Sequence, residues 1–596
     1  MNRWRDKTFG DLADALRLYR PFIGAVVALL LVALVLPGRD SIGGVAAGTD
    51  KSGVQNFEAA DGTTDTTDGS GTASTIALPG GSTSATVSTG AARPGALRVG
   101  GAAASSPNCD TATGRIKIPT IYAPPCVAPF TGSNGGATYQ GVTADKIKIV
   151  VYIPQEDPAS GALLSAAGID DTLEQVKATF DGYADYFQSH YETYGRKVEL
   201  VYLQASGADA DDASARADAI KVATEIKAFM SWGGRVLTNA YQDELAARGV
   251  PCICPKAPPI EYGLEHAPYY YSQLMFSSQA YIHRAEYIGK MVYGKKAQWA
   301  GDPLFQQQPR KIGLVYTDTA AGDIKPGVDF FEKELTKYSA KLDDRVSILL
   351  DIPRMQEQAR TIIARLKDKG ITTVALATTF LDPIFLTTEA TRQGYLPEWL
   401  VIGSALTDTA AWARLYDQNQ WSHAFGLSQL PGRLVPDKTD PWALWQWHFN
   451  GGTPPADDTF AVMFAPEFMF FTGLHLAGPT LNPTTFRNGM FSFPPTGGGF
   501  TTPMMSFGNH GFWPWDDYSP FDDATEVWWD ATVRGPDETG SNGQGMYRYV
   551  DAGKRYRAGQ WPQRAPKAFD NAGTVVIYND VPPGEKAPTY PHQPHN

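Results

Sequence analysis

The stretch FMSWGGRVLTNAYQDELAARGVPCICPK, residues 229–256, decides the predicted fold class. A short apolar run ends in Gly233-Gly234, a helix is predicted over residues 240–248, and a second apolar run follows before Pro255. A strand, a helix and a strand in this order are typical of an open parallel sheet, in which small ligands bind beside the carboxyl ends of the strands. The two glycines allow backbone N–H groups to approach such a ligand closely.

The alternation of strand and helix extends on both sides of this stretch. Before it, strands are predicted over 147–153 and 198–203, with helices over 172–191 and 213–227. After a passage rich in Pro and Tyr the alternation starts again, with strands predicted over 312–316, 346–350, 373–377 and 399–403 and helices over 279–292, 328–338, 359–366 and 384–392. Each set has the size of a domain, so the pattern predicts an α/β fold with two lobes, each built on a parallel sheet.

Length and charge restrict the function classes. A chain of 596 residues is too long for one hydrophobic core, so at least two domains are expected. Acidic residues outnumber basic ones, 63 to 51, which gives a net charge of −12. This balance argues against a general nucleic-acid-binding protein, because such proteins need a basic surface.

The N-terminal sequence predicts export. Basic residues precede the apolar run 22–36 and almost none follow it, which places the N-terminus inside the cell and the rest outside. The run suits a signal peptide and is short for a membrane-spanning helix, so residues 1–40 are expected to be an uncleaved anchor or a cleaved signal. Residues 41–141, rich in Gly, Ser and Thr, are predicted to be a flexible tether. We therefore expect the protein at the extracytoplasmic face of the membrane.

The four cysteines agree with export. They allow three pairings, and their spacing alone does not choose among these. Cys109 and Cys126 flank a Pro-rich segment, so a disulfide closing this loop is the most economical pairing. A zinc site would need four ligands at a recognisable spacing, and no CxxC or histidine pair supplies them. No metal site is predicted.

The last third of the chain departs from the alternating pattern. A helix is predicted over 460–476, late strands over 526–530 and 546–550, and a disordered tail from residue 582. The segment 510–523, HGFWPWDDYSPFDD, offers candidate calcium ligands in Asp516, Asp517, Asp522 and Asp523. It also offers two candidate rings for stacking on a sugar, Trp513 and Trp515. A packed aromatic loop with a solvated acidic rim is the favoured interpretation.

Polar and aromatic residues follow several predicted strands at the point where each strand ends. In parallel sheets these positions share one edge and face one crevice between the lobes. No nucleophile–base pair is recognisable among them, so binding is favoured over catalysis, and no catalytic residue is predicted. The candidate ligand-binding residues are Trp232, Gly233, Gly234, Arg235, Tyr316, Thr317, Asp318, Thr378, Thr379 and Ser404.

The order of these elements resembles the type I periplasmic binding proteins, especially the branched-chain amino acid (Leu/Ile/Val) group. The matching pieces are KIKIVVYIP, YGRKVELVYLQ, FMSWGG, ARGVPCICP, RKIGLVYTD, ARLKDKGITTVALAT and RQGYLPEWLVIG, together with the later FAPEFMFFTGLHLAGPTLNPTTFRNGM. The resemblance covers some 400 residues in pattern and order. No single motif is diagnostic.

The resemblance implies two Rossmann-like lobes joined by a three-strand hinge that closes on a ligand. Lobe 1 would comprise residues 142–271 and 405–507, and lobe 2 residues 272–404 and 508–565, followed by a C-terminal tail over 566–596. Family contacts with a ligand correspond to the strand-end loops, which adds Lys256 to the candidates. No cofactor is implied.

The sequence therefore predicts an exported solute-binding protein that captures a small polar ligand, an amino acid or a related compound. It would deliver this ligand to an ABC importer or present it to a membrane sensor, without acting as an enzyme and without binding nucleic acid. Two alternatives remain open at this point: a hydrolase of envelope glycans that uses carboxylates near Asp516, and a non-catalytic adhesion or structural module on a stalk.

Overall fold

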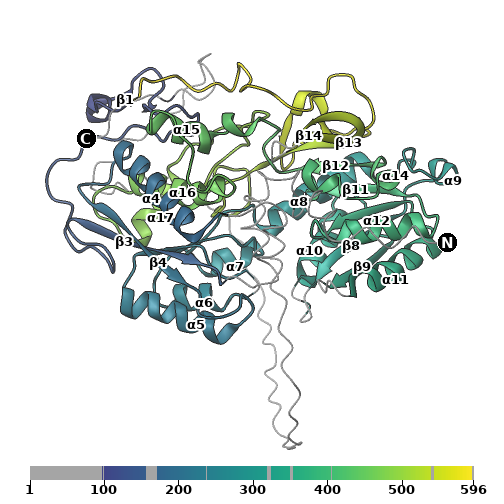
Figure 1. Ribbon diagram of the computed structural model, residues 1–596, viewed down its shortest axis with the longest axis horizontal. Coiled ribbons are helices and arrows are strands. Elements are labelled where there is room, and N and C mark those ends of the chain that lie inside the picture. Colours follow the sequence, from purple (N-terminus) through teal and green to yellow (C-terminus); the bar gives the residue numbers. More distant parts are fainter. Residues whose placement is uncertain are drawn as a thin grey trace, which may run out of the picture.

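Two α/β lobes lie side by side, each built on one main sheet (Figure 1). The computed structural model describes residues 97, 100–155, 171–236, 238–318, 322, 324–349, 354–403, 406–537 and 542–592. The predicted signal or anchor segment and most of the predicted tether lie outside the described residues.

Lobe 1 is built on a five-stranded sheet in which all neighbouring strands are parallel. The order is β4 (Lys197–Gln204), β3 (Lys146–Ile153), β5 (Met230–Trp232), β6 (Cys252–Cys254) and β7 (Tyr270–Ser272). The apolar side chains of β3 are buried, as expected for a strand with both faces covered. Its helices are α4 (Leu173–His190), α5 (Asp212–Lys221) with the π-helical η2 (Val222–Ile226), α6 (Ala240–Ala247), α7 (Ile260–Glu265), α15 (Asp440–His448), α16 (Phe460–Ala477) and α17 (Pro483–Phe491).

Lobe 2 is built on an eight-stranded mixed sheet. Five strands are parallel, in the order β9 (Asp344–Leu349), β8 (Ile312–Asp318), β10 (Thr373–Ala377), β11 (Glu398–Ile402) and β12 (Ala424–Ser428). The antiparallel strands β13 (Asp523–Pro536), β14 (Asn542–Tyr549) and β15 (Arg555–Arg557) complete it. The helices are α8 (Ser277–Tyr287) with the π-helical η3 (Ile288–Val292), α9 (Pro303–Gln306), α10 (Lys325–Thr336), α11 (Met355–Asp368), α12 (Asp382–Arg392), α13 (Ala410–Ala413) and α14 (Gln418–Trp421).

The chain passes between the two sheets three times, as the resemblance implied. The first crossing lies between β7 and α8, the second between β12 and α15, and the third between α17 and β13. One expected boundary is wrong: residues 405–428 were assigned to lobe 1, but β12 pairs with β11 in the sheet of lobe 2. The sequence of β12, AFGLS, contains no β-branched residue and includes Gly and Ser, so its composition does not indicate a strand.

The N-terminal part of the described chain packs on lobe 1. Strands β1 (Cys109–Asp110) and β2 (Arg115–Ile116) pair with each other, and the predicted Cys109–Cys126 disulfide is present. The Tyr122 hydroxyl donates to the Pro503 carbonyl, and Thr138 donates to that of Leu481, both at 2.7 Å. The expectation of a tether as far as residue 141 is therefore too long. The other two cysteines, Cys252 and Cys254, also form a disulfide.

The predicted disorder of the chain after residue 582 is wrong for the part that the structure describes. Trp447 on α15 donates its indole N–H to the Tyr590 carbonyl at 2.9 Å, and the Tyr590 hydroxyl donates to Asp110 at 2.7 Å. Pro-rich composition suggested disorder, but these contacts fix the segment to lobe 1.

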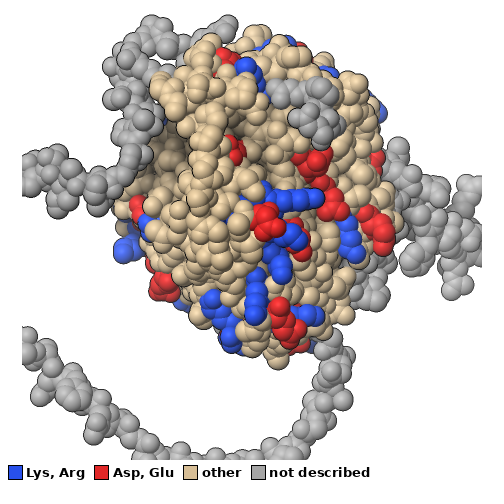
Figure 2. Space-filling view, turned by 90° about the vertical axis from the view of Figure 1, so that its left-hand side faces the viewer, with Lys and Arg blue, Asp and Glu red and all other residues tan. Residues whose placement is uncertain are grey.

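The surface at the lobe 1 end carries charges of both signs. Figure 2 shows Lys and Arg side chains alternating with Asp and Glu over its lower half, whereas the upper half is mostly uncharged. No continuous basic surface is visible among the described residues on this face, in keeping with the acidic composition.

Within the described part of the chain, one helix, α16, is long and apolar enough to span a membrane. It is a core helix of lobe 1, because 61% of its apolar window is buried. Phe471 stacks on Phe187 of α4 with a centroid distance of 5.1 Å, and Phe470 meets Trp232 of β5 at 5.3 Å. The helix thus joins α4 to the sheet.

Glu467 stands in the middle of this apolar helix. Its side chain is fully buried, and neither carboxyl oxygen has a hydrogen-bond partner among the described residues. Burial raises the pKa of Glu467 well above its usual value, and the nearby Asp181 adds to the shift. The ionised form is therefore disfavoured in the folded protein.

We predict that Glu467→Gln stabilises the protein, and by more at pH 8 than at pH 5. Because the folded-state pKa is raised, the wild type loses stability as pH rises above the unfolded value, by up to about 1.4 kcal/mol per pH unit. Glutamine keeps the shape and removes the titration. Urea unfolding at both pH values measures the difference, with Glu174→Gln at an exposed position of α4 as the control. If the free energy of unfolding changes equally with pH in Glu467→Gln and in the wild type, the prediction is wrong.

Candidate functional site

The carboxyl ends of the parallel strands mark the candidate site. The first crossing leaves the carboxyl end of β7, and the second leaves the carboxyl end of β12. Since all strands of the lobe 1 sheet and five strands of lobe 2 are parallel, the crossings lie at the carboxyl edge of both sheets. A ligand-binding crevice between the lobes is expected at this edge.

Lobe 2 presents a hydroxyl–carboxyl cluster at this edge, formed by Thr317 near the carboxyl end of β8 and by Thr379 and Asp382 around the start of α12. The hydroxyl groups of Thr317 and Thr379 donate to one oxygen of Asp382 at 2.7 and 2.6 Å. The same oxygen accepts the Thr379 backbone N–H at 2.8 Å. The other oxygen, Oδ1, is buried and has no hydrogen-bond partner within the described residues.

Burial raises the pKa of Asp382 to about 6, although the hydrogen bonds from both threonines oppose the shift. Thr317 and Thr379 were predicted as site residues, and the structure brings them together: Thr317 Oγ1 accepts the Thr379 N–H at 3.0 Å. Asp382 was missed. Its signal in the sequence is an aspartate three residues after Thr379, at the start of a helix, where carboxylates commonly accept backbone N–H groups.

The other predicted residues of lobe 2 lie around this cluster. Tyr316 and Thr378 are almost fully buried. Asp318 is half-buried and accepts the Ile324 backbone N–H at 3.0 Å, which orders the start of α10. Ser404 lies outside the described residues.

Trp232 does not form a crevice wall in lobe 1. It is 1% exposed and packs edge-on against Phe470 of α16, so it belongs to the core. Its place at the end of a short strand made it look like a ligand contact, but the apolar face of α16 covers it.

The two glycines of the opening stretch serve close packing of the backbone. Gly233 has a φ of +85°, and a Cβ there would lie 2.8 Å from the Tyr152 carbonyl oxygen. A Cβ at Gly234 would lie 3.0 Å from the sulfur of Cys254. A side chain at either position would come too close to other atoms of lobe 1. Close packing within lobe 1 therefore accounts for both glycines, and no ligand is needed to explain them.

Arg235 is a structural residue of lobe 1. It is 1% exposed, and its five N–H donors are all used, by Asp218, Tyr152, Ser214 and the carbonyls of Gly207 and Ala208. Burial would raise the pKa of Asp218, but the hydrogen bonds from Tyr152, Ser206 and Arg235 hold it below its usual value. No donor of Arg235 is left for a ligand.

Lys256 follows β6 at the same edge. Its ammonium group donates to the Asn239 side chain at 2.6 Å, and its carbonyl accepts hydrogen bonds from Tyr270 and Ser272. It therefore orders the loop after β6, and its half-buried position keeps it among the residues proposed to line the crevice.

A buried ion pair holds the crossings together. Arg555 on β15 donates to Asp523 on β13 with an Nε–Oδ1 distance of 2.7 Å, and both side chains are at most 2% exposed. The other guanidinium N–H groups donate to the carbonyls of Gln429 and Leu430 in the second crossing. Asp523 also accepts the Met504 backbone N–H at 2.9 Å, so this pair connects the second and third crossings.

The acidic segment 510–523 belongs to the same hinge. Asp517 accepts hydrogen bonds from Gln279 of α8 and from Ser519, and Asp522 accepts them from Ser506 and Trp513. Burial raises the pKa of Asp522 to about 7, and the charge of Asp523 adds to this shift. Burial also raises the pKa of Asp517 well above its usual range, with a further contribution from the charge of Asp522.

Neither the calcium nor the hydrolase interpretation of this segment fits its surroundings. Both oxygens of Asp517 and both oxygens of Asp522 accept hydrogen bonds from protein groups, so these buried carboxyls serve as acceptors within the hinge. Trp513 and Trp515 stack on each other, with rings 5° from parallel. The expected acidic rim is solvated only at Asp516.

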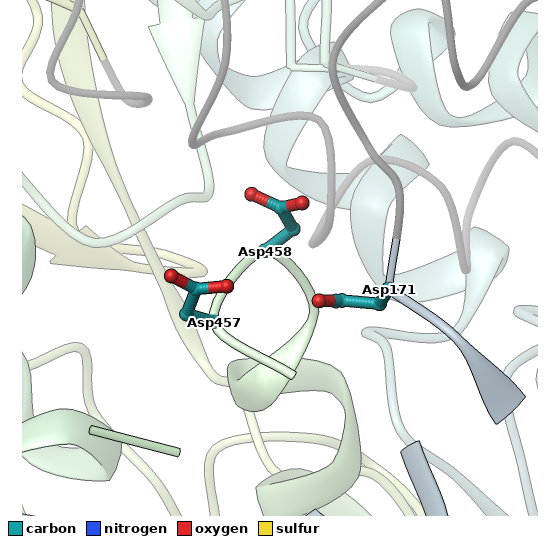
Figure 3. Close-up of side chains that lie close together, drawn as sticks. All are labelled: Asp171, Asp457 and Asp458. Atoms are coloured by element: carbon teal, nitrogen blue, oxygen red, sulfur yellow. The ribbon is translucent and has the colours of Figure 1, made fainter. Parts of the chain in front are cut away.

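Three carboxylates come together elsewhere, at the start of α4 and before α16. The oxygens of Asp171, Asp457 and Asp458 lie within 4.8 Å of one another (Figure 3). Burial raises the pKa of Asp171, and the neighbouring Asp457 contributes to the shift. Thr459 donates to Asp171 at 2.6 Å. Proximity alone points to no ion, and we assign no metal to this group.

Comparison with known proteins finds similarity only among solved structures. No protein-family model and no curated protein matches the chain. A solute-binding protein of an ABC transporter from R. palustris, in complex with 4-hydroxybenzoate, is 13% identical, covers 70% of this chain and 98% of its own, and has a TM-score of 0.46.

Two further similar structures are a substrate-binding protein of a transporter and a periplasmic binding protein. The branched-chain amino acid transporter substrate-binding protein LivJ from Streptococcus pneumoniae, in complex with isoleucine, is 14% identical over 68% of this chain and 100% of its own, with a TM-score of 0.44. A periplasmic binding protein type 1 from Bordetella pertussis is 15% identical over 65% and 97%, with a TM-score of 0.44. At such identities the likeness concerns the path of the backbone and assigns no ligand to this chain.

We predict that Arg235→Met destabilises the protein by about 3–5 kcal/mol, because Asp218 is left buried without its cation. Urea unfolding measures the loss. Arg248→Met is the matched control directly after α6, where the ion pair of the exposed Arg248 with Glu244 is worth less than about 1 kcal/mol. Equal stabilities of the two variants would show that Arg235 is not the structural residue described above.

Proposed function

We propose that the protein is an exported solute-binding protein that holds a small polar ligand between its two lobes. The observation that carries the proposal is the shared carboxyl edge: the crossings leave both sheets at this edge, and the hydroxyl–carboxyl cluster of lobe 2 lies there. Hinge closure would cover the ligand, because the ligand binds the closed arrangement more tightly than the open one.

The cluster favours a ligand with a hydrogen-bond donor. The hydroxyl protons of Thr317 and Thr379 are committed to Asp382, so their remaining lone pairs act as acceptors. Asp382 itself has a buried oxygen without a partner, and a nearby cation would favour its ionised form. An ammonium group, as in an amino acid, fits this surrounding better than a second carboxylate.

The proposed site comprises strand-end residues from both lobes. In lobe 2 it includes Thr317, Thr379 and Asp382, flanked by Tyr316, Asp318 and Thr378; in lobe 1 it includes Lys256 and the backbone of the loop after Gly234. Ligand delivery to an ABC importer or a membrane sensor at the extracytoplasmic face is part of the same proposal. It is supported by the two-lobed fold and by the predicted export signal.

We expect at least one compound in a thermal-shift screen to raise the melting temperature of the protein. The screen should contain amino acids, amides, short carboxylic acids and aromatic acids. If every compound leaves the melting temperature unchanged, the proposal loses its basis. A compound that binds is then taken to titration calorimetry with variants of the cluster.

Thr379→Val should weaken binding of that compound by about 10- to 100-fold, because a hydrogen bond to a charged group contributes roughly 1.5–3 kcal/mol. Thr388→Val is the matched control, since Thr388 is exposed on α12 and its hydroxyl donates to the Ile384 carbonyl of its own helix. Equal affinities of the two variants would place the ligand away from the cluster.

A further inference from the structure

The C-terminal strap, residues 566–592, runs from one lobe to the other. Figure 1 shows this yellow segment leaving the region of β14, passing over the top of the molecule and ending beside β1. It is separate from the three crossings of the two-lobed fold, so the chain connects the lobes a fourth time. Its contacts are distributed over both lobes.

The first part of the strap is fixed to lobe 2. Val575 and Tyr549 of β14 exchange two backbone hydrogen bonds, at 2.8 and 3.1 Å. The Lys567 backbone N–H donates to Glu526 of β13 at 2.8 Å. Strand pairing and this charge-assisted bond make the start of the strap an extension of the lobe 2 sheet.

The middle of the strap follows the second crossing. The Tyr578 N–H donates to the Arg433 carbonyl at 3.0 Å, and Tyr578 forms a parallel bridge with Leu434. Its ring also meets that of Phe500 at 5.1 Å.

Phe500 stands at the tip of an arm that reaches from lobe 1 to lobe 2. We define the Phe500 arm as residues 496–505, whose ends are paired by two backbone hydrogen bonds between Thr496 and Met505. The ring of Phe500 is buried against Tyr549 of β14, with centroids 4.9 Å apart. Met505 at the base of the arm packs in the core of lobe 1.

Glu585 of the strap binds the tip of this arm through hydrogen bonds. Its carboxylate accepts the backbone N–H groups of Phe500 and Thr501 at 2.7 and 2.8 Å and the hydroxyl groups of Thr501 and Thr502 at 2.6 and 3.0 Å. Four hydrogen bonds to one carboxylate are charge-assisted and hold both the strap and the arm in register.

The last part of the strap is fixed to lobe 1. Besides the Trp447–Tyr590 and Tyr590–Asp110 hydrogen bonds, His592 contacts the Trp447 carbonyl at 2.8 Å. Trp447 in turn packs on His190 of α4, with centroids 4.7 Å apart. A change in the angle between the lobes therefore has to stretch the strap or break one of its anchors.

We propose that the C-terminal strap and the Phe500 arm form a latch that limits how far the two lobes open. Glu585, which binds residues 500–502 of the arm, is the clasp of this latch. Opening moves the lobe 1 anchor at Trp447 away from the lobe 2 anchor at Tyr549, and the latch resists this movement. The latch restricts the open state whether or not a ligand is bound.

Spin labels at Ile220→Cys on α5 and Leu304→Cys on α9 test the latch in the full chain without ligand. Both positions are exposed, at 38% and 74%, and the four native cysteines are paired in disulfides. Distances between the labels are measured by pulsed electron paramagnetic resonance. In Glu585→Ala we expect a broader distribution, shifted to longer distances, relative to the otherwise unchanged chain.

Lys586→Ala is the matched control, because Lys586 lies next to Glu585 but, among the described residues, forms its ion pair with the exposed Asp580 of the strap itself. Its distribution should equal that of the unchanged chain. If Glu585→Ala fails to fold, Tyr590→Phe, which removes one hydroxyl from the lobe 1 anchor, takes its place. An unchanged distribution in a folded anchor variant would overturn the latch. Because the distances are measured without ligand, an unchanged distribution would overturn the latch and leave the proposed ligand binding untouched. Likewise, a failure of every compound to bind would leave the latch untouched.

Discussion

The buried ion pair between Arg555 and Asp523 is the interaction on which the relation between the two lobes depends. Arg555 holds the second crossing through the carbonyls of Gln429 and Leu430, and Asp523 holds the end of the third crossing and the Phe500 arm. Removing one partner of such a pair leaves an uncompensated buried charge. Loss of either side chain is therefore expected to destabilise the segments that join the lobes.

The hinge contains buried polar side chains, and so do both lobes, where Arg235 with Asp218 and Arg310 with Glu398 form buried ion pairs. The parallel strands of each lobe are covered on both faces, which leaves their carboxyl edges as the places where polar loops gather. The crossings leave from these same edges. A ligand held there would contact both lobes and would lie beside the segments that join them.

Much of the fold could be predicted from the sequence, because strands β3, β8, β10 and β11 are apolar runs between amphipathic helices. Strand β7 has only three residues, and β12, AFGLS, contains no β-branched residue, so neither gives a clear strand signal in the sequence. The site was predictable only in part. Thr317 and Thr379 follow strands in a recognisable way, whereas the role of Arg235 depends on Asp218 and Tyr152, which come from separate elements. Long-range partners of this kind are not encoded in local spacing. The C-terminal strap was missed for the same reason.

The central claim is that a small polar ligand is held between the lobes and closes them. The most direct measurement is the distance between spin labels at positions 220 and 304, before and after saturation with the compound that gives the largest thermal shift. We expect a shorter mean distance and a narrower distribution in the saturated protein. Saturation without any change in the distance would contradict closure and would place the ligand outside the crevice between the lobes.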